Sequence, residues 1–205
     1  YRPIVDAAKS LNNNSKSDKF KKNEKKTIAL LKKIKLQNIS INNSNKKYFA
    51  PRTISELKKV IKKYPNAKLL SGGTDMSLIV TKEKKDINNI IYLNSIDELN
   101  YIKENSTYIE VGATTSLRKF ESFIKKYYED FHNILKRYGS IQIRNVATIA
   151  GNIATASPIG DTLPLLLSLD ARVVLQNLNK ITVLPLKNFF IGYRKTKLKK
   201  GQFIH

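Results

Sequence analysis

The sequence contains no cysteine and only two histidines, His132 and His205. Without cysteine, neither disulfides nor thiolate-bound metals can form within these residues, and two histidines are too few for an ordinary histidine metal site. No window approaches the run of about eighteen uncharged apolar residues that a membrane-spanning helix needs. We therefore predict no metal site and no membrane partner for this chain.

The usual catalytic sets are also missing. A Ser-His-Asp arrangement has only one internal histidine to draw on, and no close pair of carboxylates resembles a glycosidase site. His132 falls on a predicted helix, which is typical of a surface or partly packed residue. We predict no catalytic residue, so any chemistry performed by this chain must be supplied by a cofactor.

Acidic residues are scarce: 16 aspartates and glutamates stand against 38 lysines and arginines, and the net charge is +22. A charge of this kind is typical of nucleic-acid-binding proteins. Here the lysines are spread through almost every segment, Lys, Asn and Ile are enriched together as AT-rich codons would produce, and no nucleic-acid-binding motif accompanies them. We predict no nucleic acid partner, keep a basic binding module as the alternative, and expect the positive field to help attract phosphorylated cofactors.

One stretch of the chain has no core pattern. Residues 11–46 are polar and highly charged, apart from a brief amphipathic run at 27–36, and they are interpreted as a linker. Across residues 47–205, regular elements alternate with turn signals, which predicts one folded domain. The first residues lack an initiator methionine and any signal-peptide pattern, so we expect the sequence to be a fragment.

Hydrophobic spacing within the predicted domain indicates both helices and strands. Thr53 followed by Glu56 forms a capping-box pattern that starts a helix ending at Tyr64. Further helices are predicted at 116–128, 129–139 and 162–171, and strands at 90–93, 107–114, 172–177 and 180–186, the last two as a hairpin. This order predicts an α+β fold, with a helix–strand region first and a more antiparallel region second.

The stretch "SGGTD" (71–75) lies between a short apolar strand and a helical pattern. Gly72 and Gly73 allow positive φ angles and the close approach of a ligand to the backbone. The N–H groups of such a turn can bind phosphate oxygens, and the hydroxyls of Ser71 and Thr74 can add hydrogen bonds. A purely structural tight turn explains the same residues and stays the alternative, because neither GxGxxG nor a P-loop pattern is present.

The stretch "TIAGNIATASPIGD" (148–161) has no basic residue in an otherwise lysine-rich chain. Gly151 and the alanines around it remove bulk, so a flat or extended ligand can lie against the backbone. Asn152 and nearby hydroxyls are neutral donors and acceptors, and Asp161 can accept two hydroxyl hydrogen bonds, as a ribose requires. Tight packing of a helix–strand junction is the equal alternative for this stretch alone. Two such loops in one domain favour a dinucleotide with a pyrophosphate and a sugar.

Three stretches in this order, "LLSGGTD", "IRNVATIAGNIATASPIGDTLPLLLSLDA" and "FFIGYRKT", closely resemble the FAD-binding domain of the molybdenum hydroxylases. That family includes xanthine dehydrogenase, aldehyde oxidase and carbon monoxide dehydrogenase. The resemblance covers residues 47–205 and implies a two-subdomain FAD-binding fold of the vanillyl-alcohol oxidase and molybdopterin dehydrogenase type, which agrees with the missing GxGxxG. We expect "GQFIH" to precede the domain's last strands, and therefore this fragment alone to bind FAD weakly or not at all.

The start of the chain adds to the resemblance. "YRPIVDAA" is similar to the segment that follows the last cluster-ligating cysteine of the helical 2Fe–2S domain in xanthine dehydrogenases. Residues 1–10 would then be the C-terminal tail of an iron–sulfur domain fused ahead of the flavin domain. In carbon monoxide dehydrogenase-type enzymes the flavoprotein is usually a separate subunit, so the fused order favours the xanthine dehydrogenase branch. A flavin domain that serves aldehyde or N-heterocycle oxidation is the alternative.

The resemblance also implies an oxidoreductase function and partners. A molybdenum cofactor on another domain or a large subunit would hydroxylate hypoxanthine and xanthine to urate. Electrons would pass through 2Fe–2S clusters to FAD and then to NAD. This chain would hold FAD alone, with the 2Fe–2S clusters and molybdopterin outside it. We expect a cytoplasmic hetero-oligomer that takes part in purine catabolism.

Matching positions carry the family's FAD site over to this sequence. Residues 69–76 would hold the pyrophosphate, residues 148–152 would form a second binding segment, Tyr138 would lie against the flavin, and Asp161 would reach the cofactor's sugar region. The implied cofactor-binding residues are Leu69, Leu70, Ser71, Gly72, Gly73, Thr74, Asp75, Met76, Tyr138, Thr148, Ile149, Ala150, Gly151, Asn152 and Asp161. Two of them, Gly73 and Ala150, stand at positions that vary within the family, and both keep the site small.

Overall fold

The computed structural model describes residues 2–13 and 20–205 and divides the chain into two compact units, the first up to Leu36 and the second Gln37–His205. The first unit contains helix α1 (Arg2–Asn13), the 3-10 helix η1 (Lys21–Asn23) and helix α2 (Glu24–Lys32). Helix α2 overlaps the amphipathic run at 27–36. All side chains that the structure describes in this unit are exposed.

The predicted tail and most of the predicted linker fall in the first unit. Residue 1 and residues 14–19, which belong to these predicted segments, lie outside the described residues. The assignment of residues 1–10 to the end of an iron–sulfur domain stays a prediction. So does the linker that would follow, except at its C-terminal end, where the structure places a strand.

The second unit opens with a four-stranded sheet. Its strands are β1 (Ile39–Asn43), β2 (Lys46–Ala50), β3 (Lys68–Leu70) and β4 (Asn89–Tyr92), in the order β1-β2-β4-β3. β1 pairs antiparallel with β2, whereas β4 pairs parallel with both β2 and β3. Parallel pairs need crossovers, which α3 (Ile54–Lys63) and α4 (Met76–Thr81) provide. Leu57 and Ile61 of α3 share a buried apolar cluster with Phe49 and Ile91 of the sheet.

Helix α3 begins as its capping-box pattern predicts. Thr53 is the N-cap, and its side chain accepts a hydrogen bond from the N–H of Glu56 at 3.2 Å. The Glu56 carboxylate accepts the N–H of Arg52, also at 3.2 Å. The two side chains thus satisfy backbone donors at the helix start that would otherwise lack a partner.

Strand β1 lies within residues 11–46, which the sequence pattern indicates as linker, so the folded unit starts before residue 47. Its 5 residues pair with β2, beginning with Ile39 opposite Ala50. All of their side chains are exposed. An edge strand of this kind is held by backbone hydrogen bonds rather than by burial, so it leaves no hydrophobic signal in the sequence.

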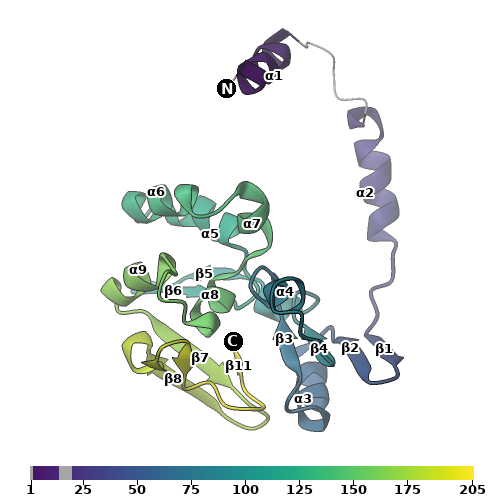
Figure 1. Ribbon diagram of the computed structural model, residues 1–205, viewed down its shortest axis with the longest axis vertical. Helices are drawn as coiled ribbons and strands as arrows, with labels where there is room; N and C mark the ends of the chain where they lie inside the picture. The colour runs from purple at the N-terminus through teal and green to yellow at the C-terminus, as the bar shows by residue number, and fades with distance from the viewer. Residues whose placement is uncertain (1, 14–19) are drawn as a thin grey trace. The chain divides into compact units, whose positions relative to one another are not determined.

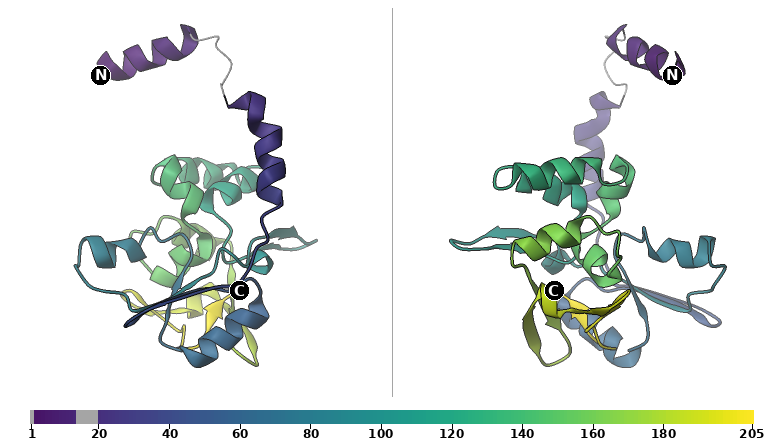
Figure 2. Two further views of the ribbon diagram at one scale, coloured as in Figure 1. Left: turned by 90° about the vertical axis from the view of Figure 1, so that its right-hand side faces the viewer. Right: turned by 60° about the vertical axis from the view of Figure 1, so that its left-hand side comes forward.

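The rest of the second unit combines short helices with small antiparallel sheets. Its elements are η2 (Asp97–Leu99), β5 (Ile102–Glu104), β6 (Ile109–Val111), α5 (Leu117–Ile124), α6 (Glu129–Arg137), α7 (Ile141–Val146), α8 (Ile149–Thr155), α9 (Thr162–Ser168), β7 (Arg172–Gln176), β8 (Ile181–Pro185), η3 (Leu186–Asn188), β9 (Phe190–Gly192), β10 (Lys195–Thr196) and β11 (Phe203–Ile204). β7 and β8 form the predicted hairpin, and β11 pairs antiparallel with β7. In Figure 1 and Figure 2, α8 and α9 lie between helices α5–α7 and the β7–β8–β11 sheet. One buried apolar cluster joins these layers through Phe120, Ile153 and Val173.

Strand β11 connects the two parts of this unit. Phe203 is fully buried and belongs to the apolar cluster of the four-stranded sheet, although its strand pairs with β7. The carbonyl of His205 accepts the N–H of Ala113 at 2.8 Å, and its own N–H donates to the carbonyl of Val174 at 2.8 Å. Residues 203–205 therefore hold the two apolar clusters against each other.

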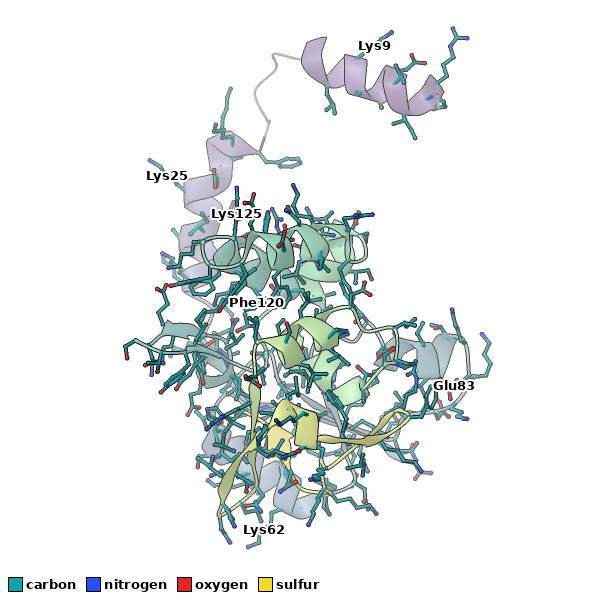
Figure 3. All side chains as sticks on the ribbon, turned by 90° about the vertical axis from the view of Figure 1, so that its left-hand side faces the viewer. Lys9, Lys25, Lys62, Glu83, Phe120 and Lys125 are labelled. Carbon is teal, nitrogen blue, oxygen red and sulfur yellow. The ribbon has the colours of Figure 1, made fainter. Side chains whose placement is uncertain are left out.

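Charged side chains cover the outside of the second unit. Figure 3 shows Lys62, Glu83 and Lys125 at its periphery, while Phe120 lies in the interior. Among the described residues, no helix is long and apolar enough to cross a membrane. Over the same residues, no group of three or more histidine and acidic side chains could hold a metal ion.

Candidate functional site

The two loops predicted from the sequence meet in the structure. The first loop, residues 71–75, lies between β3 and α4, and the second loop, residues 148–161, comprises α8 and the turn before α9. A methyl group placed on Gly72 would lie 2.0 Å from the carbonyl oxygen of Val146 and 2.8 Å from the Cα of Ala147. Only glycine permits this approach, which brings the first loop against the residues that lead into the second.

The two glycines of the first loop have different roles. The sequence predicts positive φ angles and space for a ligand at both. Gly73 does have a φ of +72°, and a Cβ there would meet only the Leu70 side chain, at 3.3 Å. Gly72 has no positive φ, and the chain's own backbone fills the space beside its Cα. Gly73 is therefore required by the turn, and Gly72 by the packing of one loop on the other.

The backbone of the first loop carries unused hydrogen-bond donors. Within the described part of the chain, the N–H groups of residues 72–75 donate to no protein acceptor. The Ser71 hydroxyl, by contrast, is occupied, because it donates to Oδ1 of Asn94 at 2.6 Å. Consecutive unpaired N–H groups in a glycine turn can bind the oxygens of a phosphate. The ligand interpretation of this loop therefore applies to its backbone rather than to Ser71.

The small residues of the second loop divide into two groups. Ala150 and Ala156 are buried, whereas Gly151 and Ala154 are exposed. The Thr148 side chain is also buried and caps α8 by accepting the N–H of Gly151 at 3.1 Å. The packing explanation thus accounts for the buried alanines. The ligand explanation applies to the exposed face formed by Gly151 and Ala154.

Asn152 connects the second loop to Tyr138 at the end of α6. Its amide nitrogen donates to the Tyr138 hydroxyl at 3.0 Å, and its Oδ1 accepts a hydrogen bond from the Thr162 hydroxyl. Because the Tyr138 oxygen accepts the amide hydrogen, its own hydroxyl hydrogen stays available for a ligand. The site therefore holds a part-buried aromatic ring with a hydrogen-bond donor at its tip.

Two carboxylates, one from each loop, act on this hydroxyl. Burial raises the pKa of Tyr138, and the negative charges of Asp161 and Asp75 raise it further. Both aspartates are exposed, and among the described contacts neither side chain caps the helix that it precedes. Their oxygens can therefore accept hydrogen bonds from the hydroxyl groups of a ligand.

Several predicted residues can offer only backbone groups to a ligand. Leu69 packs against the apolar cluster of the four-stranded sheet, and Ile149 and Ala150 are buried. Thr74, within the first loop, and Met76, the first residue of α4, are partly buried. The structure thus brings the predicted segments together, while their binding of a cofactor stays a prediction.

Sequence reasoning misses two charged residues that lie beneath the site. Glu121 of α5 and Arg144 of α7 form a buried ion pair, with 3.0 Å between Oε2 and Nε. A signal for it exists in the sequence, because Glu121 shares a helical face with Leu117, Phe120 and Ile124. A carboxylate on an otherwise apolar face indicates a buried partner.

Tyr138→Phe is expected to reduce the loss of stability at alkaline pH. The raised pKa of Tyr138 means that the folded state favours the neutral hydroxyl. The contribution of this hydroxyl to the free energy of unfolding is fully present below the ordinary tyrosine pKa of 10.0. It is lost as the pH rises through the higher pKa of Tyr138 in the folded state. The midpoint temperature of thermal unfolding, measured between about pH 8 and 11, should therefore fall less steeply with rising pH in the variant.

Part of the alkaline slope should remain in Tyr138→Phe, since burial also raises the pKa of Tyr48 and of Tyr101. The matched control is Tyr193→Phe, which changes a ring that is 75% exposed. If the wild type and Tyr138→Phe lost stability equally steeply with rising pH, the Tyr138 hydroxyl would not contribute to the pH dependence of stability.

Known proteins share both the sequence and the fold of this chain. The family model described as the FAD binding domain in molybdopterin dehydrogenase matches residues 40–205. Xanthine dehydrogenase of Emericella nidulans is 32% identical over 183 residues, which cover 84% of this chain and 13% of that protein. The nicotinate dehydrogenase FAD-subunit of Eubacterium barkeri is 32% identical over 151 residues, covering 71% of this chain and 50% of that subunit.

A solved structure agrees with these sequence relatives. A chain of carbon monoxide dehydrogenase from Hydrogenophaga pseudoflava has a TM-score of 0.73 and 26% identity, over 80% of this chain and 58% of that chain. This chain thus spans only part of each of these relatives, and the predicted α+β FAD-binding fold is confirmed. The chain belongs to the family of FAD-binding domains in molybdopterin dehydrogenases, and FAD is the cofactor of this domain.

Proposed function

We propose that this chain is the FAD-binding electron-transfer part of a xanthine dehydrogenase, an enzyme that oxidises hypoxanthine and xanthine to urate. The observation that carries the proposal is the packing of the first loop, whose N–H groups are unpaired, against the residues that lead into the second loop. The second loop has an exposed face of small residues and a hydrogen bond from Asn152 to Tyr138. Similarity to a xanthine dehydrogenase over 84% of the chain supports the substrate class.

The residues at this meeting point fit the chemical groups of FAD. The N–H groups of residues 72–75 would bind the pyrophosphate oxygens. Asp161 and Asp75 would accept hydrogen bonds from the sugar hydroxyls. Tyr138 would lie against the flavin ring, and Gly151 would let the cofactor approach the backbone of α8 closely. The chain's part is to bind and orient the cofactor rather than to act as an acid or a base.

When bound, FAD supplies the redox chemistry, in which electrons arrive from 2Fe–2S clusters and leave as a hydride to NAD. The clusters and the molybdenum cofactor would be held outside this chain, the latter by a large subunit or domain. Residues 1–10 would be the end of the iron–sulfur domain. The complete enzyme would be a cytoplasmic hetero-oligomer with neither a membrane nor a nucleic acid partner.

A second candidate is a flavin domain that serves the oxidation of an N-heterocycle other than a purine. The observation that favours it is the 32% identity to the nicotinate dehydrogenase FAD-subunit. The two candidates differ only in the substrate of the molybdenum partner. Adding xanthine, hypoxanthine or nicotinate to the purified holoenzyme without NAD, while recording the visible flavin spectrum, separates them. Bleaching by the purines alone supports xanthine dehydrogenase, and bleaching by nicotinate alone overturns it.

Asp161→Ala is expected to weaken FAD binding in the holoenzyme by about tenfold or more. A hydrogen bond to a charged group contributes about 1.5–3 kcal/mol, and about 1.4 kcal/mol corresponds to a factor of ten. Flavin content, molybdenum and iron are measured on the same preparation. Flavin should be depleted, while both metals stay at wild-type levels.

The matched control for Asp161→Ala is Asp86→Ala, which removes a surface carboxylate whose partner is Lys46. Asp86 lies outside both loops, so flavin content should not change. Full flavin occupancy in Asp161→Ala would remove Asp161 from the site. Loss of molybdenum or iron together with flavin would indicate general misfolding instead.

A further inference from the structure

A buried ion pair lies next to the proposed site without belonging to either loop. Glu121 of α5 is 2% exposed and Arg144 of α7 is 8% exposed. Their side chains meet with 3.0 Å between Nε and Oε2. Burying two charges carries a large desolvation cost, and apolar side chains of similar volume are often at least as stable. Stability alone therefore does not explain why the core contains this pair.

The Arg144 guanidinium has a second set of partners at the end of α6. Its Nη1 donates to the carbonyl oxygen of Tyr138 at 3.0 Å and to that of Gly139 at 2.8 Å. Gly139 has a φ of +56°, so the backbone turns sharply directly after Tyr138. One side chain thus ties α5, α7 and this turn together, and no apolar residue could donate to the two carbonyls.

Tyr138 is consequently held at both ends. Its backbone carbonyl accepts from Arg144, and its hydroxyl accepts from Asn152 of the second loop. Fixing both the backbone and the tip of a side chain restricts where the ring can lie. Ligand sites generally need this kind of support, because a shift of about 1 Å in a contacting group strongly reduces its contribution.

We propose that Arg144, itself held by Glu121, is a positioning residue that fixes Tyr138 for contact with the flavin. The inference rests on the proposed FAD site. The bidentate contact to the Tyr138 and Gly139 carbonyls is the feature that carries it, and Glu121 keeps the guanidinium oriented toward them.

The test compares Arg144→Met with the double variant Glu121→Met plus Arg144→Met in the purified holoenzyme. The single variant leaves the Glu121 carboxylate buried without this partner, so it should lower thermal stability. The double variant replaces both charges with apolar volume and should recover most of that stability. Neither variant can donate to the two carbonyls. Both should therefore bind FAD about tenfold more weakly than wild type. Removing a residue that orients a ligand-binding side chain lowers affinity by about this factor or more at metal sites.

A matched control is available within the same ion-pair network. Arg118 also pairs with Glu121, with 2.7 Å between Nη1 and Oε1, but its side chain is 45% exposed. Arg118→Gln removes one of the two positively charged partners of Glu121 and leaves the turn after Tyr138 unchanged. This variant should retain the wild-type affinity for FAD. Arg144→Lys, which keeps the charge and can reach a carbonyl, should recover part of the affinity that Arg144→Met loses.

Two measurements distinguish positioning from general stability. The dissociation constant for FAD is measured on deflavinated holoenzyme, and the visible circular dichroism of rebound flavin reports its surroundings. Recovery of stability without recovery of affinity or of the dichroism in the double variant supports the proposal. Wild-type affinity and dichroism in the double variant overturn it.

Tyr138→Ala and Asp161→Ala separate failure of the inference from failure of the proposed site. If both lose FAD while the double Met variant binds it normally, the site stands and the positioning role is wrong. If neither loses FAD, the proposed site is wrong, and the inference falls with it.

Discussion

Gly72→Ala is expected to remove FAD from the holoenzyme and to destabilise the domain by about 3 kcal/mol. The added methyl carbon would lie 2.0 Å from the carbonyl oxygen and 2.6 Å from the carbonyl carbon of Val146. Both atoms belong to the backbone, so no side-chain rotation can relieve the overlap. The first loop must move away from the second, which separates the N–H groups of residues 72–75 from Tyr138. Flavin content and the rate of limited proteolysis measure the two effects.

The control for this substitution is Gly201→Ala. Gly201 has a φ of +77°, but a Cβ there would have only the Ile61 side chain nearby, at 3.9 Å. The cost should be that of a left-handed alanine, about 1–2 kcal/mol, with flavin retained. Equal flavin content in Gly72→Ala and Gly201→Ala would mean that the contact with Val146 does not support the site.

Phe203→Ala is expected to lower the stability of the domain by about 4 kcal/mol, because it leaves a cavity the size of a phenyl ring in a closed core. Phe203 is 0% exposed and packs in the cluster of the four-stranded sheet, while its strand pairs with β7. The cavity therefore weakens the contact between the two parts of the unit. When the holoenzyme is heated, we expect the variant to release its flavin at a lower temperature, which the rise in flavin fluorescence reports.

The comparison for Phe203 is Phe190→Ala. Phe190 is only partly buried at the edge of the other apolar cluster, so its removal should cost less. Flavin content before heating should be near the wild-type level in both variants, because neither residue lies in the loops. A release temperature that is the same for both would show that Phe203 does not join the two clusters in the way described.

Local signals in the sequence predict much of this fold. Thr53 caps α3, β7 and β8 form a hairpin, and the first loop lies between a strand and a helix, all as their patterns indicate. Capping, turn formation and hydrophobic periodicity act over a few residues, so they can be recognised without knowledge of the rest of the chain. Strand β1 is the exception, since an exposed edge strand depends on pairing rather than on its own side chains.

The candidate site depends more strongly on the tertiary structure. The sequence supplies the small residues at 147–156 but cannot say which of them face the core. The fold buries Ala150 and leaves Gly151 exposed. Of two neighbouring positions in one helix, the first therefore serves packing and the second is accessible to a ligand. Asn152 similarly acts through its hydrogen bond to Tyr138, a partner in a different element.

By itself, the sequence determined the family and the cofactor class, because three of its stretches closely resemble the FAD-binding domain of the molybdenum hydroxylases. It also indicated two loops as candidate binding segments, because glycine turns and small-residue stretches are local features. Only the tertiary structure decided that Gly72 serves loop packing and that Gly73 serves the turn. It also decided that Arg144 and Glu121 support Tyr138. These roles are contacts between distant segments, and their energies depend on burial and close approach that exist only once the chain has folded.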